Sequence, residues 1–470
     1  MSKKIGLYPS QESDLEFYTQ NLVIPITNRG EFEWKVNGKK VSPNFKNTGF
    51  DYDTDYKMLI GEFSKSSKIF ERHFLPSQQN ELIYRDLAIQ TIRLSEELKA
   101  NAVVSVIFFT GSSHHIDSLI CELACRIAGI KQIFLYSVPM ARGRLLPIIQ
   151  TNGVITRSNL DKCISSEIFT KQIDDFSTAT LNNANYYLSS FSQNLYYSIW
   201  NLLASAFKKF LYRVLHDLVR RIKREPSSTS SLKSISFYTD LFLLLKQKYS
   251  TKVLNDYISS DSTKVLTQSQ VGNLVIFAHF EPEATNFPEG GEWHNVTDLV
   301  TKIRSLGYTD NIIYKEHFAF KYYMQYRQSM RGGLARSKSF YDDLRSLGCL
   351  FVDKNYEPND LSIVVTLVGT TALERSLSGK YTVVLGHIWY AGIPGSITLE
   401  NAINLLKTSS LAVNSNTIIN NARNFLCGCL NHKTINNAKG IGTGKPSGNE
   451  DDWSEFYQEI NNLLKELAGY

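Results

Sequence analysis

Long apolar runs are missing from this 470-residue chain, and so is an apolar stretch near its N-terminus. A helix that crosses a bilayer needs about 20 consecutive, mostly apolar residues, so we expect no membrane-spanning segment. The opening residues, MSKKIGLYPSQESD, carry charge but lack the apolar centre of a secretory signal. We therefore expect a protein that stays in the cytoplasm.

Cysteine is scarce, and the spacings of the six cysteines do not repeat as the ligands of a zinc site do. Cys427 and Cys429 are too close for an easy mutual disulfide, while Cys121 and Cys125 lie one helical turn apart in an apolar pattern. We expect reduced, structural thiols. The motifs G-x-S-x-G and H-E-x-x-H are also absent, and no set of nucleophile, base and orienting group is visible. These absences disfavour a hydrolase.

An excess of one charge is small over the whole chain, because 51 basic against 45 acidic side chains give a net charge of +6. A balance this mild does not by itself indicate a nucleic-acid partner. The excess is nevertheless concentrated, since residues 208–224 hold seven basic residues and a single acid. The segment 200–224 around them has the apolar stripe of an amphipathic helix, with the charges on its other face.

Three interpretations of this basic helix are open. It can pack its stripe inside the protein with its charges solvated, bind nucleic acid, or lie on an anionic membrane surface. The interleaving of basic residues with aromatic residues and glycines that is typical of RNA-binding segments is missing here. We favour the membrane surface and expect no nucleic-acid partner.

What the chain does contain is an alternation of strand and helix patterns. The apolar run 102–109 is typical of a strand in a parallel sheet covered on both faces, and a helix that ends near Gly129 follows it. A second alternation begins at residue 273, after the linker-like residues 225–234. We predict an α/β protein with two doubly wound, Rossmann-like domains that face a cleft. Their expected bounds are 1–265 and 266–445, with a C-terminal helix in 446–470.

Polar residues gather where the strands of the second half end. Parallel strands end at one edge of a sheet, and side chains two residues apart share a face. His279 and Glu281 form such a pair, as do Lys315 and His317, and Glu283 extends the first pair if the backbone stays extended past Pro282. Lys315 and His317 can both donate hydrogen bonds to a phosphate.

A third strand of this half runs into Gly369, Thr370 and Thr371 at the start of a helix. The free N–H groups of a helix N-terminus favour a phosphate, and the two hydroxyls can add hydrogen bonds. Glu374 follows in the first turn, where a carboxylate either stabilises the helix electrostatically or accepts hydrogen bonds from the ribose of a nucleotide.

The first half offers candidates at two strand ends. His115 and Asp117 lie at a strand-to-helix turn, where Asp117 is either a helix cap or, in a cleft, a general base or nucleophile. Arg142 and Arg144 follow the next strand and suit an anionic substrate, because a guanidinium binds a carboxylate or phosphate bidentately.

The ordered segments HFEPEATNFPEGG, YKEH and TLVGTTALERSLSGKYTVVLG resemble the capsule polysaccharide synthesis family, which includes bacterial Kdo transferases and relatives that use other nonulosonic acids. The resemblance covers roughly residues 273–395, including GHIWYAGIPG, and extends more weakly over 101–147. It implies a GT-B glycosyltransferase that moves a sugar acid from a CMP-activated donor to a growing surface polysaccharide. It also implies that no metal is essential and that no other cofactor is needed.

The resemblance also implies roles for individual residues. His279, Glu281 and Glu283 would line the donor site, Thr370 and Thr371 would take the phosphate, and Glu374 the ribose. Lys315 and His317 match the family's K-x-H-P element, although Phe318 replaces its proline and so alters the local turn. Asp117 matches the acidic residue that serves as base or nucleophile.

A basic helix on the membrane suits an acceptor that is a lipid-linked glycan, which would place the enzyme on the inner face of the cell membrane. Two alternatives remain open at this stage. One is an enzyme that uses a UDP-sugar, a GDP-sugar or CDP-glycerol as donor. The other is a non-catalytic partner in polysaccharide assembly, which would bind glycan without nucleotide.

Overall fold

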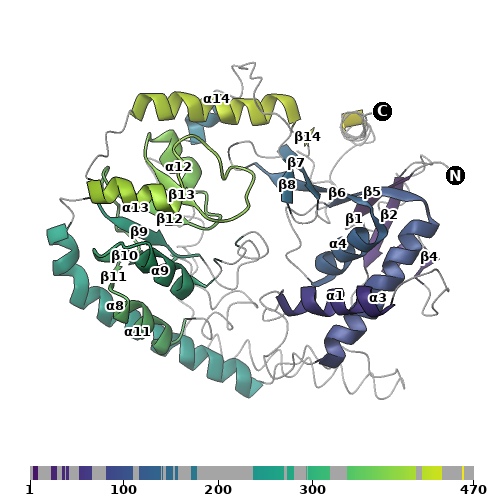
Figure 1. Ribbon diagram of the computed structural model, residues 1–470, viewed down its shortest axis with the longest axis horizontal. Helices are drawn as coiled ribbons and strands as arrows, with labels where there is room; N and C mark the ends of the chain where they lie inside the picture. The colour runs from purple at the N-terminus through teal and green to yellow at the C-terminus, as the bar shows by residue number, and fades with distance from the viewer. Residues whose placement is uncertain are drawn as a thin grey trace.

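The computed structural model describes residues 4–8, 23–28, 34–37, 39–41, 52–65, 81–108, 116–138, 140, 144–151, 154–156, 171–176, 237–268, 272–279, 290, 293, 295–317, 336–408, 415–433, 435–436 and 458–459. These residues form a mixed α/β fold with two sheets, one of nine strands and one of five. The two sheets occupy opposite sides of the view in Figure 1, each with helices packed against it.

The nine-stranded sheet has the order β14-β7-β6-β5-β1-β2-β3-β4, with β8 paired to β7. Its strands are β1 Lys4–Tyr8, β2 Val23–Asn28, β3 Trp34–Val36, β4 Lys39–Lys40, β5 Val103–Phe108, β6 Lys131–Ser137, β7 Arg144–Thr151, β8 Val154–Thr156 and β14 Ile435–Asn436. The helices α1 Tyr52–Lys65, α3 Glu81–Ala100 and α4 Ile116–Ala128 belong to the same half.

Four strands of this sheet, β2, β1, β5 and β6, run parallel to one another. The order reverses between β1 and β5, where Tyr8 pairs with Phe108 at the last residue of both strands. In open α/β sheets ligands bind beyond the carboxyl ends of the strands at such a switch point.

The five-stranded sheet is parallel throughout, with the order β11-β10-β9-β12-β13. Its strands are β9 Leu274–Phe277, β10 Ile312–Lys315, β11 Cys349–Val352, β12 Ile363–Thr366 and β13 Thr382–Val384. The helices α9 Val296–Ser305, α11 Lys338–Ser346, α12 Thr371–Leu377 and α13 Leu399–Thr408 alternate with them. The strand order reverses between β9 and β12, which makes this the switch point of the second sheet.

The local sequence explains where the helices of the second half begin and end. Asn295 accepts a hydrogen bond from the Thr297 N–H at 3.1 Å and caps α9, and Ser337 accepts from the Phe340 N–H at 3.2 Å and caps α11. Gly348 ends the α11 turn with a φ of 82°, a backbone conformation that glycine adopts without steric cost.

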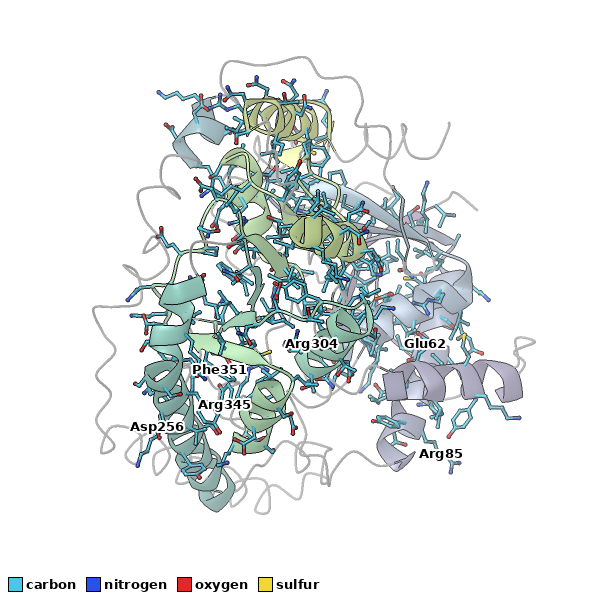
Figure 2. The ribbon with its side chains drawn as sticks, turned by 60° about the vertical axis from the view of Figure 1, so that its left-hand side comes forward. Glu62, Arg85, Asp256, Arg304, Arg345 and Phe351 are labelled. Carbon is cyan, nitrogen blue, oxygen red and sulfur yellow. The ribbon has the colours of Figure 1, made fainter. Side chains whose placement is uncertain are left out.

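The amino ends of the strands in this sheet are tied by Arg304, the last-turn arginine of α9 (Figure 2). Its guanidinium donates to the carbonyl oxygens of Leu347 at 2.8 Å, Tyr308 at 2.8 Å and Asp310 at 2.6 Å. This guanidinium therefore satisfies carbonyl groups in the turns that lead into β10 and β11. These turns lie at the amino edge of the sheet, opposite to the carboxyl edge where the sequence predicts the site.

Two long helices depart from the expected division of the chain. α8 Phe237–Gln268 packs along β11, the edge strand of the second sheet, although residues up to 265 were expected to belong to the first domain. α14 Ser415–Lys433 contacts both α12 and β7, and β14 then pairs antiparallel with β7 (Figure 1). The chain thus returns to the first sheet before residue 445, the expected end of the second domain. It does so because α14 packs against both α12 of the second half and β7 of the first.

The expected strands and helices of the second half and the βαβ unit of the first are confirmed, with ends that shift by a few residues. The strands β2, β3, β4, β7, β8 and β14 were not expected from the sequence. The expected basic helix 200–224 lies outside the described residues, as does most of 446–470. Within the described part of the chain, no helix has the length and apolar character needed to cross a bilayer.

Candidate functional site

His279 lies just beyond the end of β9 and is 8% exposed. Its Nε2 accepts the Leu367 N–H at 2.8 Å and lies 3.1 Å from the Thr366 Oγ1. Since Nε2 accepts a backbone N–H, the ring proton is on Nδ1, and the Thr366 hydroxyl donates. His279 therefore organises the loop between β12 and α12, a role that the sequence did not reveal.

The same loop is held from a second direction. Tyr390, in the segment after β13, donates to the Val368 carbonyl at 2.6 Å. A Cβ on Gly369 would lie 2.7 Å from the Thr366 Oγ1, so only glycine fits where the chain passes Thr366 and His279. Two buried side chains, His279 after β9 and Tyr390 after β13, thus take backbone groups of this loop.

Lys315 ends β10 with a half-buried side chain at the same edge of the sheet. Its Nζ donates to the Tyr356 carbonyl at 2.8 Å and lies 4.7 Å from the centre of the Phe277 ring. Burial lowers the pKa of Lys315, while the carboxylates of Glu357, Asp353 and Glu374 act in the opposite direction. The nearby carboxylates favour the charged form of Lys315 and offset part of its positive charge, whereas partial desolvation strengthens any electrostatic contact that the ammonium makes.

Glu374 lies in the first turn of α12, one turn from Thr370. Thr370 Oγ1 donates to Glu374 Oε1 at 3.2 Å. Burial raises the pKa of Glu374, and the Thr370 hydrogen bond and the Lys315 charge both lower it. The Thr371 Oγ1 is 3.8 Å from the Cβ position of Gly369. Glu374 thus contacts Thr370 and lies within electrostatic reach of Lys315.

His317 follows Lys315 with one residue between them and is half-buried. Burial, with a further contribution from the positive charge of Arg336, lowers its pKa to about 4. His317 is therefore neutral at pH 7 and can offer an N–H donor but no positive charge. Of the two residues expected to supply the positive side of a phosphate site, only Lys315 carries charge.

Between these two residues lies Glu316, which the sequence did not single out and which is 7% exposed. Its Oε2 accepts from Tyr314 Oη at 2.9 Å, Arg336 Nε at 3.0 Å and Tyr341 Oη at 3.1 Å. Its Oε1 accepts the His317 N–H at 2.8 Å. Alternation along the strand could have indicated that Glu316 points away from Lys315 and His317, but nothing in the sequence points to Arg336.

These contacts decide against a dinucleotide site of the Rossmann type. That site uses a carboxylate at the end of the second strand for the ribose, together with G-x-G-x-x-G after the first strand. The oxygens of Glu316 are already occupied by donors, and the residues after β9 contain no such glycine pattern. Asp353 and Glu374 are half-buried carboxylates that act on Lys315, and Glu374 is the one at the start of α12.

In the first sheet, Asp117 is in the first turn of α4, near its switch point, with a half-buried side chain. Tyr8, at the end of β1, makes a side-chain hydrogen bond with Ser118, and burial followed by the negative charge of Asp117 raises the pKa of its phenol well above the ordinary value. Tyr8 and Asp117 therefore lie close together.

Several candidates from the sequence fall outside this picture. Glu281, Glu283, His115 and Arg142 lie outside the described residues. Arg144 is the first residue of β7, where its backbone pairs with Asn436 of β14. The sequence placed Arg144 after a strand, and the structure places it within one, because β7 begins at this residue and pairs antiparallel with β6.

Neither metal nor thiol chemistry is indicated by the described residues. Within them, no group of three histidine, cysteine, aspartate or glutamate side chains is arranged to hold a metal ion. The five cysteines that the structure describes are buried and form no disulfide with one another. Burial raises the pKa of Cys349 to about 12, so this thiol remains protonated at neutral pH.

Comparison with known proteins adds no assignment: no protein-family model and no curated protein sequence matches the chain.

Proposed function

We propose that this protein is a glycosyltransferase that moves a sugar acid, Kdo or another nonulosonic acid, from a CMP-activated donor to a growing surface polysaccharide. The observation that carries the proposal is the group of polar side chains at the switch point of the five-stranded sheet. Lys315 from β10, Thr370 before α12 and Glu374 in α12 interact with one another there. His279 from β9 holds the loop that joins them.

The chemistry of this group suits a nucleoside monophosphate. The phosphodiester of a CMP-sugar carries a single negative charge, which the Lys315 ammonium matches, and the neutral His317 adds an N–H donor. Glu374 cannot stabilise a phosphate, but its carboxylate can accept hydrogen bonds from the ribose hydroxyls. Fixed donors of this kind stabilise the charge that develops on the leaving CMP without a metal.

In the transfer itself the bond from the sugar's anomeric carbon to the phosphate oxygen breaks, and a bond to the acceptor hydroxyl oxygen forms. The electron pair of the broken bond leaves with CMP. The hydroxyl proton goes to a carboxylate, for which Asp117 of the first sheet is our candidate. The resemblance to capsule polysaccharide synthesis proteins motivates the choice of donor, and the basic segment 200–224 motivates a lipid-linked acceptor at an anionic membrane surface.

The test is a calorimetric titration of the purified chain with CMP, UMP and GMP, without added metal. We expect CMP to bind preferentially. Lys315→Met should weaken CMP binding by about 10- to 100-fold, because a charge-assisted hydrogen bond contributes about 1.5–3 kcal/mol. Glu374→Gln should weaken it by about tenfold or less, because its partners are neutral hydroxyls.

Two matched variants control for the charge change alone. Lys302→Met on α9 and Glu400→Gln on α13 alter exposed residues of the same types, and both should bind CMP as the parent does. A preference for UMP or GMP would retain the site and replace the donor class. Binding of glycan with no binding of any nucleotide would replace the enzyme with a non-catalytic assembly partner.

A further inference from the structure

Arg336 and Glu316 form an ion pair at the carboxyl edge of the second sheet, and both side chains are almost completely buried. The Arg336 side chain is 2% exposed and the Glu316 side chain 6% exposed, with Nε and Oε2 3.0 Å apart. Arg336 also lies over the Phe340 ring, with its guanidinium carbon 4.7 Å from the ring centre. Replacing such a buried pair by apolar residues is often neutral or stabilising, so stability alone does not account for its presence.

The contacts of the pair show what it does hold. Arg336 Nη2 donates to the His279 carbonyl at 2.8 Å, at the point where the chain leaves β9. Glu316 Oε1 accepts the His317 N–H at 2.8 Å, at the point where the chain leaves β10. One ion pair thus joins the ends of the two neighbouring strands that carry the candidate site, and two tyrosine hydroxyls fix the carboxylate between them.

Three residues of the candidate site, His279, Lys315 and His317, lie at these two strand ends. Arg336 holds the His279 carbonyl, and the His279 ring accepts the Leu367 N–H at 2.8 Å through Nε2. The position of His279 therefore affects the loop before α12. Lys315 and His317 are the sequence neighbours of Glu316, whose carboxylate accepts the His317 N–H. The charge of Arg336 also acts on His317, and it favours the neutral imidazole.

We propose that Arg336 and Glu316 are the positioning pair of the anion site: they set the distance between the ends of β9 and β10 so that Lys315, His317 and the loop after β12 converge on one phosphate. This inference rests on the proposed function for the identity of the ligand. Neither residue touches the ligand, so both act through the groups that they hold.

The first test measures CMP affinity in Arg336→Lys and Glu316→Gln. Lysine keeps the charge but cannot reach Glu316 and the His279 carbonyl in the same fork geometry, and glutamine keeps the shape without the charge. We expect each variant to lose about tenfold or more in affinity. If Glu316→Gln does not fold, the conservative Arg336→Lys variant decides the question.

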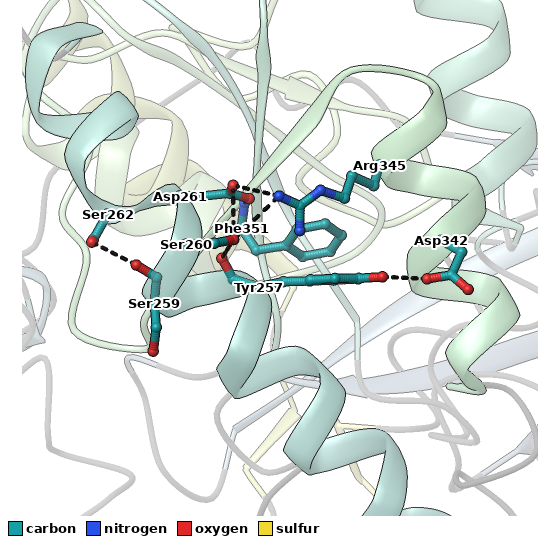
Figure 3. A network of polar contacts seen from close by, with 8 residues as sticks. All are labelled: Tyr257, Ser259, Ser260, Asp261, Ser262, Asp342, Arg345 and Phe351. Carbon is teal, nitrogen blue, oxygen red and sulfur yellow. Dashed lines mark hydrogen bonds and ion pairs between the residues drawn. The ribbon is translucent and has the colours of Figure 1, made fainter.

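A matched control is provided by a second ion pair in the same half of the protein. Arg345 Nη2 of α11 is 3.2 Å from Asp261 Oδ1 of α8 (Figure 3). Arg345→Met should lower the thermal unfolding midpoint yet leave CMP affinity within about twofold of the parent. If Arg336→Lys behaves in the same way as Arg345→Met, the pair is only structural and the proposal is overturned.

A second readout needs no ligand and separates this inference from the proposed function. The Leu367 amide donates to His279, so its hydrogen exchange reports whether the loop is held. We expect faster exchange at Leu367 in Arg336→Lys and unchanged exchange in Arg345→Met. If the parent chain binds no CMP, the proposed function fails, but faster exchange at Leu367 still supports the positioning role. Unchanged exchange in Arg336→Lys overturns it.

Discussion

At the scale of single residues, the edge of the second sheet depends on side chains that accept more than one hydrogen bond. His279 takes a backbone N–H and a hydroxyl through one ring nitrogen, and Glu316 takes four donors through two oxygens. Buried groups that satisfy several partners in this way hold a backbone in one conformation, because any displacement leaves several polar groups unpaired.

His279→Ala should therefore destabilise the protein and loosen the loop before α12. The Leu367 N–H and the Thr366 hydroxyl lose their partner in a buried position, at a cost of about 1–3 kcal/mol for an unsatisfied group. Urea denaturation provides the measurement. His387→Ala, which removes an exposed histidine beyond β13, should change the free energy of unfolding by less than about 0.5 kcal/mol. Equal effects of the two substitutions would contradict the role given to His279.

His317 should make the stability depend on pH below neutrality. Its pKa is about 4 in the folded protein, below the ordinary value of 6.5, so the unfolded chain binds the proton more readily. Both states are unprotonated above about pH 7 and no stability is lost there. As the pH falls from about 6.5 to 4, stability is lost, by roughly 1–3 kcal/mol once partial exposure is allowed for.

The measurement is the urea midpoint at pH 7 and at pH 4.5 for the parent and for His317→Gln. Glutamine cannot be protonated in this range, so the variant should lose less stability on acidification. An identical loss in both proteins would mean that other groups cause the acid sensitivity. A second comparison with Arg336→Met tests the cause, because loss of the positive charge should raise the pKa of His317 toward its ordinary value.

At the scale of elements, the outer edge of the five-stranded sheet is covered by α8. Asp261 of this helix accepts the Phe351 N–H of β11 at 3.1 Å, and Tyr257 donates to Asp342 of α11 (Figure 3). Arg345 completes the contact by lying over the Tyr257 ring at 4.3 Å. An edge strand with unpaired backbone groups is open to pairing with other chains, and a carboxylate on a covering helix removes one such group.

Asp261→Ala should loosen α8 from β11. The Phe351 N–H would lose its partner inside the protein, and we expect a loss of about 1–3 kcal/mol in the free energy of unfolding. Hydrogen exchange over residues 349–352 should become faster. The control is Asp256→Ala, which makes the same change at an exposed position on the same helix (Figure 2). If both variants exchange alike over β11, Asp261 does not secure this edge.

At the scale of the whole molecule, α14 connects the two halves. It contacts α12 of the second half and β7 of the first, and the chain then adds β14 to the first sheet. Leu426 of α14 is fully buried in a cluster that also contains Leu373 of α12 and Leu146 of β7. One cluster of buried side chains therefore includes residues of both halves, and α14 contributes to it.

Leu426→Ala should weaken both halves at once. Truncating a fully buried leucine costs about 2–5 kcal/mol, and here the cavity would border elements of both sheets. Hydrogen exchange should accelerate over residues 144–151 and over 371–377. Asn421→Ala, at an exposed position of the same helix, should leave both segments unchanged. Faster exchange in only one segment would show that Leu426 serves a single half.

Much of the second half followed from the sequence because its signals are local. Apolar runs of strand length, bounded by helix periodicity and turn residues, predicted a parallel sheet, and parallel strands all end at one edge. That rule predicted that β10 and β12 end at one edge of the sheet, where Lys315 and Glu374 act on each other electrostatically. The first half was less predictable, since β2, β3, β4 and β14 are short or lack a periodic pattern, and their pairing is decided by distant partners.

The sequence by itself determined the α/β class, the repeated strand–helix order and the set of polar residues at the strand ends, because side-chain periodicity and helix signals act over a few residues. Only the tertiary structure decided that His279 holds a loop, that His317 is neutral and that Glu316 pairs with Arg336. It also decided that α8 packs on β11 and that α14 contacts both α12 and β7. Burial, a charge from a distant residue and the packing of an apolar face all depend on which segments meet, and that information is not local to any stretch of the chain.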